Sequence, residues 1–198
     1  MIRKILGITM FKILDENNNE SLTQLATHLK KGEVAIIPCD TIYGIVGISP
    51  QSEQVIRNIK NRSNEKSFIE LITLEMANLI SAKELDESLI KFWPGPLTLI
   101  VEDSNKNSRA IRVPNSPFLL TLLKEIGSSL YSSSVNITNQ KHLTDFDKIV
   151  ELFGSKVSLF VRGTIDEKAL PSTILDVRTK PYKLIREGAL DLRAFLEY

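Results

Sequence analysis

Apolar and polar residues follow a helical period in some segments and form short apolar runs in others. Apolar side chains recur every three or four positions from Leu22 to Leu29, which predicts an amphipathic helix. Ser21 and Gln24 have the spacing of a capping box at its start, and Gly32 can end it. The polar run at 15–20 is expected to form the turn or loop that leads into this helix.

Short apolar runs between turn residues predict strands. These runs lie at 34–37, 68–73, 97–102, 110–113, 130–135, 157–161, 173–177 and 183–186, and Pro38 is expected to end the first. Helical patterns lie at 55–59, 76–80, 85–92 and 145–153, the last starting after Thr144, and a short helix is expected to close the chain. Another helix is predicted to begin at Ser116-Pro117 and to end at Gly127. Because strands and helices mostly alternate without a linker, we predict one domain, 1–198, with an α/β or α+β sheet covered by helices.

The composition is that of an ordinary soluble globular protein. Apolar residues make up 42% of the 198 residues and charged residues 25%, and the formal net charge of +1 gives no global basic field for nucleic acid. Cys39 is the only cysteine, which excludes an internal disulfide and a multi-cysteine metal site. Residues 1–11 have two basic residues and a short apolar run but lack the longer apolar segment and small-residue cleavage site of a signal peptide. No apolar stretch approaches the roughly 20 residues that span a bilayer. We expect a cytoplasmic protein without membrane association, and residues 1–12 are interpreted either as part of the domain or as a poorly ordered or non-native extension.

Two early segments carry candidate chemistry. The run 38–44 follows an apolar strand and combines a proline, an aspartate, a hydroxyl and a glycine, which suits either a simple strand-ending turn or a ligand-binding loop. Lys60, Arg62 and Lys66 place three cations within seven residues at the end of a helix. They could hold a polyphosphate, although such a run is more often a solvated helix terminus.

The later candidates are single cations and hydroxyls on strands. Arg112 has apolar neighbours, so it either points outward or meets an anion in a cleft. The small polar groups from Ser132 to Asn136 suit contact with phosphate or sugar oxygens, and a serine-rich edge strand is the alternative. The hydroxyl pair at 172–173 and Arg186 could be ordinary surface. The segment 93–98 is interpreted as structural, with Trp93 packing and the two prolines setting the chain direction.

Several common catalytic signatures are absent from the sequence. It has no Walker phosphate loop, no Rossmann glycine fingerprint and no Gly-x-Ser-x-Gly elbow. His28 and His142 have no metal-ligand spacing, so no metal site is predicted. Cys39 is expected to be a small packed side chain and not a nucleophile.

The order of the motifs resembles that of the YrdC/TsaC-like threonylcarbamoyl-AMP synthase family from about residue 20 to about residue 190. The run comprises Pro-x-Asp-Thr-Ile-Tyr-Gly, Lys-x-Arg, Trp-Pro-Gly-Pro-Leu-Thr, Arg-Val-Pro, Ser-x-Asn, Ser-Thr-Ile-x-Asp and Arg-Glu-Gly-Ala. The resemblance implies an α/β fold, a single-domain twisted mixed sheet flanked by helices with a concave basic cleft. It also implies a nucleotidyltransferase that condenses L-threonine, bicarbonate and ATP, with Mg²⁺, into threonylcarbamoyl-AMP and pyrophosphate. The product would pass to a tRNA threonylcarbamoyl-transferase complex, and contact with tRNA itself would be weak or absent.

The resemblance also implies a role for each candidate residue. Thr41, Arg112, Ser132 and Ser172 would lie on the threonine side of the cleft. Lys60 and Arg62 are expected to be catalytic and to bind the ATP phosphates or the carbamoyl-adenylate. Lys66, Ser134, Asn136 and Arg186 would contact the nucleotide, and Ser134 and Asn136 also the carbamate.

Three departures from the family pattern keep alternatives open. The family usually has threonine at Cys39, a histidine near Leu71 and Ser-Gly at Thr138-Asn139. The residues expected to bind phosphate match the family pattern better than those expected to bind the amino acid. Two alternatives to the synthase therefore remain open. One is a non-catalytic nucleotide- or RNA-binding paralogue of the same fold, and the other is a related enzyme with another amino acid or carbamoyl donor.

Overall fold

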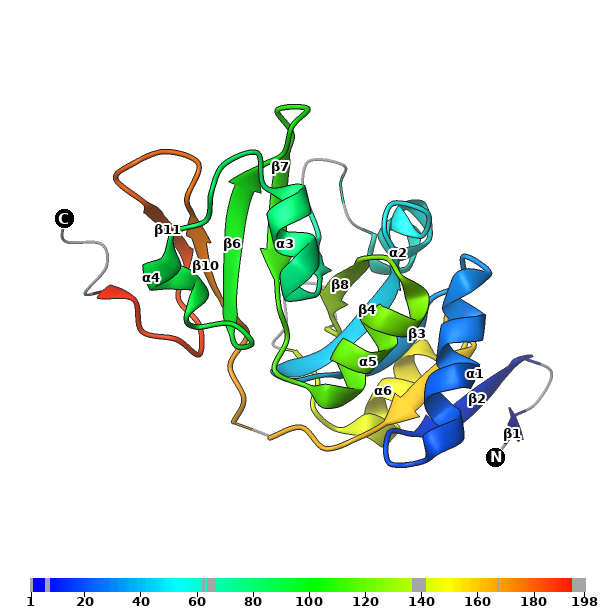
Figure 1. Ribbon diagram of the computed structural model, residues 1–198. Coiled ribbons are helices and arrows are strands. Elements are labelled where there is room, and N and C mark those ends of the chain that lie inside the picture. Colours follow the sequence, from blue (N-terminus) through cyan, green and yellow to red (C-terminus); the bar gives the residue numbers. More distant parts are fainter. Residues whose placement is uncertain are drawn as a thin grey trace.

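In the part of the chain that the computed structural model describes, eleven strands pair edge to edge into one mixed sheet (Figure 1). The structure describes residues 2–5, 8–61, 63, 67–136, 142–166 and 168–193, with side chains from residue 11 onward. The strands are β1 (Ile2–Ile5), β2 (Ile8–Asp15), β3 (Ala35–Cys39), β4 (Ile42–Ile48), β5 (Ile69–Leu71), β6 (Leu97–Glu102), β7 (Ser108–Arg112), β8 (Leu130–Ser134), β9 (Leu159–Arg162), β10 (Thr173–Asp176) and β11 (Lys183–Arg186). Their order across the sheet is β1-β2-β9-β3-β4-β8-β5-β7-β6-β10-β11. The predicted mixed sheet flanked by helices is therefore confirmed.

Six helices of the described residues cover the sheet, and successive side chains along each strand point to opposite faces of it. The helices are α1 (Asn19–Lys30), α2 (Glu53–Lys60), α3 (Leu74–Ile80), α4 (Glu87–Ile90), α5 (Pro117–Ile126) and α6 (Phe146–Phe153) within the described residues. Ile37 packs in a cluster with leucines of α1 and α5, whereas its neighbour Ile36 packs with α2 and α6. A third cluster joins α3 and α4 to β6, β7 and β10.

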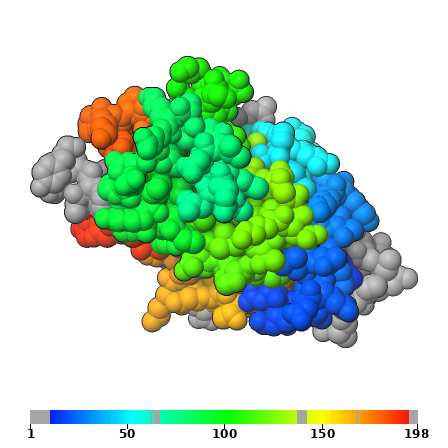
Figure 2. All heavy atoms as spheres, in the orientation of Figure 1, coloured from blue at the N-terminus to red at the C-terminus, as the bar shows by residue number. Residues whose placement is uncertain are grey.

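The sheet twists strongly from one end to the other. In Figure 1, β6 stands nearly upright while β4 runs obliquely across the view. Figure 2 shows the outer surface from the same side, where green residues that include α3, α4 and α5 fill the centre and the blue α1 flanks them. The described residues contain no helix that is both long and apolar enough to cross a bilayer.

The first hairpin corrects the strand prediction for 34–37. Pro38 does not end β3, which continues to Cys39 and pairs with β4 as far as Cys39 opposite Ile42. Pairing of β3 with β9 stops at Ile36, so Pro38 lies where one edge of β3 has no neighbouring strand in the ladder. A proline is tolerated there because its missing N–H removes no ladder bond on that side.

The helix ends show which capping signals were correct. Asn18, and not Ser21, caps α1, because the Asn18 side chain accepts a bond from the backbone N–H of Glu20. Ser116 caps α5, and Gly127 ends it in the left-handed conformation at φ +70, as predicted. Asp145 caps α6, so that helix starts one residue later than its predicted first residue.

Candidate active site

A cavity of about 300 Å³ collects most of the predicted site residues. Its walls come from β3, β4, β5, β6, β7, β8, β10 and β11 and from the turn between β3 and β4. The predicted residues that line it are Thr41, Arg112, Ser132, Ser134, Ser172 and Arg186. Residues more than 140 positions apart in the sequence are thus brought to one concave surface.

The strand register explains why these side chains share a face. One row of paired neighbours runs across four strands through Ser132, Ile69, Ala110 and Ile100. Arg112 and Ser134 lie two residues further along their strands, so they point to the same side of the sheet. The other side of β6 and β7 is filled by the apolar cluster under α3 and α4. The cavity therefore occupies the face that these two helices leave open.

Lys60 and Asn136 form one polar group with Ser134. Lys60 ends α2, where Asn61 turns the chain in the left-handed conformation at φ +46. The Lys60 ammonium donates to the backbone carbonyls of Ser134 at 2.9 Å and Asn136 at 3.1 Å, and also to the Asn136 side chain. Ser134 Oγ donates to Asn136 Oδ1 at 3.2 Å. These contacts join the predicted phosphate residues to the cavity through Ser134, which lines it.

Arg112 is held at the cavity wall by the turn between β3 and β4. Its Nη1 lies 3.0 Å from Asp40 Oδ1, and both side chains are almost fully buried. The same nitrogen donates to Thr41 Oγ1 at 3.4 Å, and Asp40 Oδ2 accepts the backbone N–H of Asn115. Arg112 Nε, by contrast, has no hydrogen-bond partner among the described residues. A buried guanidinium N–H without an acceptor costs free energy, and this nitrogen is closed off from solvent. What Arg112 offers an anion in the cavity is therefore its positive charge.

Arg186 is a second cation facing the same space. Its Nε and Nη2 donate to the backbone carbonyl of Ser172 at 3.0 and 2.7 Å, and Nη2 also donates to Ser172 Oγ at 3.1 Å. Burial lowers the pKa of Arg186, and the positive charge of Arg112 lowers it further. Two guanidinium groups close enough to repel each other make a site that a negative ligand would stabilise.

The departures at Cys39 and Leu71 fall in different places. Cys39 lines the cavity, with its sulfur 3.9 Å from Ser132 Oγ, and burial raises its pKa to about 12. Such a thiol stays protonated at neutral pH, in agreement with the prediction of a packed, unreactive side chain. Leu71 is fully buried in the apolar cluster beneath α1 and α5 and is not part of the cavity wall. Of the two substitutions, only Cys39 touches the space where a ligand would lie.

Two predicted residues cannot be placed and one important residue was missed. Arg62 and Lys66 lie outside the described residues. Asp40 was not predicted as a site residue, since nothing in the sequence links it to Arg112, 72 positions later. Its position beside Thr41 in a polar turn after a strand was the one available signal. Trp93 packs as predicted, at 7% exposure, with its indole N–H bonded to the carbonyl of Leu97.

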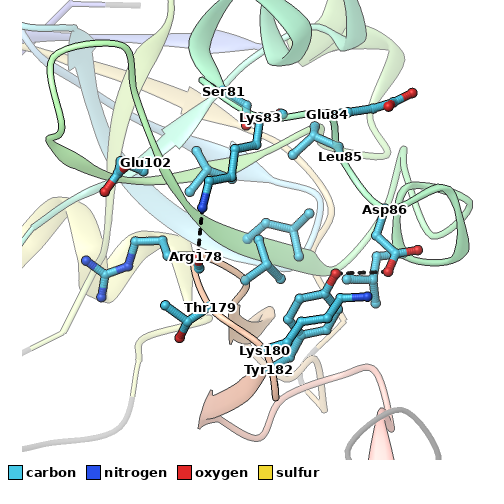
Figure 3. Close-up of a pocket in the computed structure, with 14 residues that line it drawn as sticks. Ser81, Lys83, Glu84, Leu85, Asp86, Glu102, Arg178, Thr179, Lys180 and Tyr182 are labelled. Carbon is cyan, nitrogen blue, oxygen red and sulfur yellow. Dashed lines mark hydrogen bonds between the residues drawn. The ribbon is translucent and has the colours of Figure 1, made fainter. Parts of the chain in front are cut away.

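A second cavity lies beside the β10–β11 turn (Figure 3). Its volume is about 400 Å³, and Figure 3 shows Lys83 pointing into it while Asp86 and Tyr182 face each other across one end. Two of its charged groups have partners in the protein, because Lys83 donates to the carbonyl of Arg178 and Arg178 pairs with Asp176. The described residues hold no group of three or more His, Cys, Asp or Glu side chains arranged for a metal ion.

The chain is similar in sequence to known proteins. The family model Sua5_yciO_yrdC, described as telomere recombination, matches residues 27–188. A protein of Vibrio vulnificus (strain YJ016) named threonylcarbamoyl-AMP synthase is 30% identical over 188 residues, which are 85% of this chain and 98% of that protein. A protein of Serratia proteamaculans (strain 568) with the same name is 29% identical over 185 residues, covering 84% of this chain and 95% of the relative.

Solved structures share the fold. Sua5 of P. abyssi in complex with L-threonine superimposes with a TM-score of 0.83 at 25% identity, over 94% of this chain and 59% of Sua5. This chain therefore spans less than two thirds of Sua5. E. coli YciO superimposes with a TM-score of 0.81 at 20% identity, over 96% of this chain and all of YciO.

Proposed function

The chain belongs to the Sua5/YciO/YrdC family, and from that membership we propose that it is an L-threonylcarbamoyladenylate synthase. It would condense L-threonine, bicarbonate and ATP to threonylcarbamoyl-AMP and pyrophosphate. Relatives named threonylcarbamoyl-AMP synthase, matched over 85% of this chain, support an enzyme of this family. The reaction itself, its substrates and its place in tRNA modification are our proposal.

The observation that carries the proposal is the pair of arginines at one cavity. Arg112 lines the cavity and is held there by Asp40 and Thr41, and Arg186 lies near enough for the charge of Arg112 to lower its pKa. Threonine carboxylate, bicarbonate and triphosphate are all anions that repel one another in water. A cationic cavity would hold them together and replace bimolecular encounters by proximity. In this scheme Arg112 binds the threonine carboxylate, with Thr41, Ser132 and Ser172 around the amino acid.

The chemistry requires no protein nucleophile. The threonine amine attacks the carbon of carbon dioxide and gives up a proton, so that a carbamate forms. From bicarbonate the same N–C bond forms as a C–O bond breaks and water leaves. A carbamate oxygen then attacks the α-phosphorus of ATP, and the bond to the β-phosphate oxygen breaks to release pyrophosphate. The chain's role is to orient these groups and to stabilise negative charge as it shifts to the leaving group.

The nucleotide would lie on the side of Lys60. Lys60 and Asn136 are fixed to the end of β8, beside Ser134 in the cavity wall. We propose that Lys60, Arg62 and Lys66 bind the phosphates, with Ser134 and Asn136 at the carbamate and nucleotide and Arg186 on the phosphate side. Mg²⁺ would enter with the triphosphate, because this ion keeps much of its water and binds through phosphate oxygens. A separate transferase complex would then carry the product to tRNA.

The proposal is tested by pyrophosphate release from ATP, magnesium and bicarbonate, with and without threonine. Release that depends on both threonine and bicarbonate is expected, whereas ATP binding without release would favour the non-catalytic paralogue. A panel with serine, valine and alanine in place of threonine tests the related enzyme, since Cys39 lies in the cavity wall. Lys83→Ala, in the second cavity, is the control and should leave turnover unchanged.

A further inference from the structure

Thr98 brings a buried hydroxyl to the candidate site from a segment that the sequence predicted to be structural. It lies in β6, its side chain is 0% exposed, and its Oγ1 lies 2.8 Å from Ser172 Oγ. In the part of the chain that the structure describes, this is the one hydrogen bond of the Thr98 hydroxyl. Ser172 in turn lines the cavity.

The direction of this hydrogen bond follows from counting protons. Arg186 Nη2 lies 3.1 Å from Ser172 Oγ, and a guanidinium can only donate, so Ser172 accepts that bond. If Ser172 also donated to Thr98, the Thr98 proton would have no acceptor in a fully buried position, which costs free energy. Thr98 therefore donates to Ser172. Both lone pairs of Ser172 Oγ are then occupied, and its own proton is left for a third partner.

Ser172 is only 3% exposed and lines the cavity, so the cavity is where a third partner can reach it. The neighbouring charges decide its chemistry. Arg186 bonds to Ser172 and lies close enough to Arg112 for the charge of Arg112 to lower its pKa. An O–H donor beside two guanidinium groups fits an anionic oxygen and not a cation or a neutral donor.

We propose that Thr98 is a positioning residue, which orients the Ser172 hydroxyl so that it donates to an anionic oxygen of the bound substrate. The oxygen belongs either to the amino-acid carboxylate or to a phosphate. This inference rests on the proposed function and adds a residue to its site. Thr98 itself touches no substrate and acts through Ser172.

The test compares Thr98→Val, which keeps the shape of the side chain and removes the hydroxyl, with Thr98→Ser, which keeps the hydroxyl. KM is measured separately for threonine and for ATP. Thr98→Val should raise one of the two KM values about tenfold, and Thr98→Ser should stay near wild type. The substrate whose KM rises identifies the source of the anionic oxygen.

A double-mutant cycle separates positioning from loss of packing. In a Ser172→Ala background, Thr98→Val should have no further effect on KM, because its partner is already gone. Thr173→Val is the matched control, since Thr173 is also fully buried but its hydroxyl bonds to Leu190 instead of Ser172. This control should lower the melting temperature without changing either KM.

Two outcomes would overturn the inference. They are unchanged KM values in Thr98→Val, and effects of Thr98→Val and Ser172→Ala that simply add. If the wild-type protein releases no pyrophosphate, the proposed function fails. The same variants are then compared for the Kd of threonine and of ATP by calorimetry, and equal Kd values for wild type and Thr98→Val would overturn the inference by itself.

Discussion

We expect the amino-acid side of the site to depend on Arg112. Asp40 and Thr41 fix Nη1 of its guanidinium, and Nε is buried without a hydrogen-bond partner among the described residues. Arg112→Lys keeps the charge but loses the planar fork, so we expect the KM for threonine to rise at least about tenfold. Steady-state kinetics at saturating ATP measure this.

The control for that substitution is Arg178→Lys. Arg178 is an exposed arginine that pairs with Asp176 beside the second cavity. It should leave the KM for threonine unchanged. A wild-type KM for threonine in the Arg112→Lys variant would show that Arg112 is not part of the threonine site.

Asp40 is expected to act on substrate binding only through Arg112. Asp40→Asn keeps an oxygen to accept the N–H of Asn115 but removes the charge opposite a buried guanidinium. Removing one member of a buried ion pair leaves the other charge uncompensated, so both stability and threonine binding should fall. Urea unfolding and threonine calorimetry measure the two effects. A variant that loses neither would show that the pair is not needed to hold Arg112.

Cys39 gives a pH-dependent prediction. Burial raises its pKa from 9.0 to about 12, so the folded protein at pH 8 contains far less thiolate than the unfolded chain, on the order of a thousandfold less. Because thiolate is the reactive form, iodoacetamide should label Cys39 very slowly in the native protein and quickly in denaturant. The native rate should rise with pH throughout the range from 8 to about 11. Labelling at equal rates in both states would show that the thiol is neither buried nor protonated.

The candidate residues were predictable to different degrees. Thr41, Arg112 and Ser172 could be selected because hydroxyls and an arginine interrupt apolar strands, and the order of the motifs resembled a family. The ion pair of Asp40 with Arg112 and the bond of Thr98 to Ser172 could not be predicted. Both depend on strand register between segments about 70 positions apart, which no local pattern encodes.

At the level of elements, the N-cap of α5 gives a stability prediction. The Ser116 hydroxyl accepts the N–H of Leu119, so Ser116→Ala should lower the free energy of unfolding by about 1 kcal/mol. Thr121→Ala, on the exposed face of the same helix, is the control and should be neutral or slightly stabilising, since alanine has the higher helix propensity. Equal losses in both variants would argue against a specific cap.

The β3–β4 hairpin shows where local patterns are ambiguous. The sequence left a strand-ending turn and a ligand-binding loop open for 38–44. In the structure the turn is confined to Asp40 and Thr41, and the two strands take up the rest of this run. The apolar run through β4 is buried on both faces, so it has no alternation to mark it as a strand. Strands such as β6 and β11, bounded by turn residues, were predicted with correct ends.

For the whole molecule, the net charge predicts how tightly the protein binds tRNA. A formal charge of +1 provides no general attraction to a polyanion, and Arg112 and Arg186 line a cavity. Fluorescence anisotropy with unmodified tRNA at about 150 mM salt should detect no tight binding. Tight binding with a steep salt dependence would contradict this and would favour the RNA-binding paralogue.

The order of the strands in the sheet brings the residues of the candidate site together. Strands distant in sequence become neighbours, β4 next to β8 and β6 next to β10, and their side chains meet on the face left open by α3 and α4. Alternating patterns predicted a helix-covered sheet, but strand order and the location of the cavity required the three-dimensional arrangement. The positively charged cavity is a property of the assembled sheet, because no single segment contains both arginines.

The central claim is that this cavity joins threonine, bicarbonate and ATP into one product. The most direct measurement is mass spectrometry of the reaction with carbon-13 bicarbonate. The account predicts a threonylcarbamoyl-adenylate one mass unit heavier than the product from ordinary bicarbonate, formed together with pyrophosphate and lost in Arg112→Ala. An adenylate without the carbon-13 label, or no adenylate in the presence of bound ATP, would contradict it.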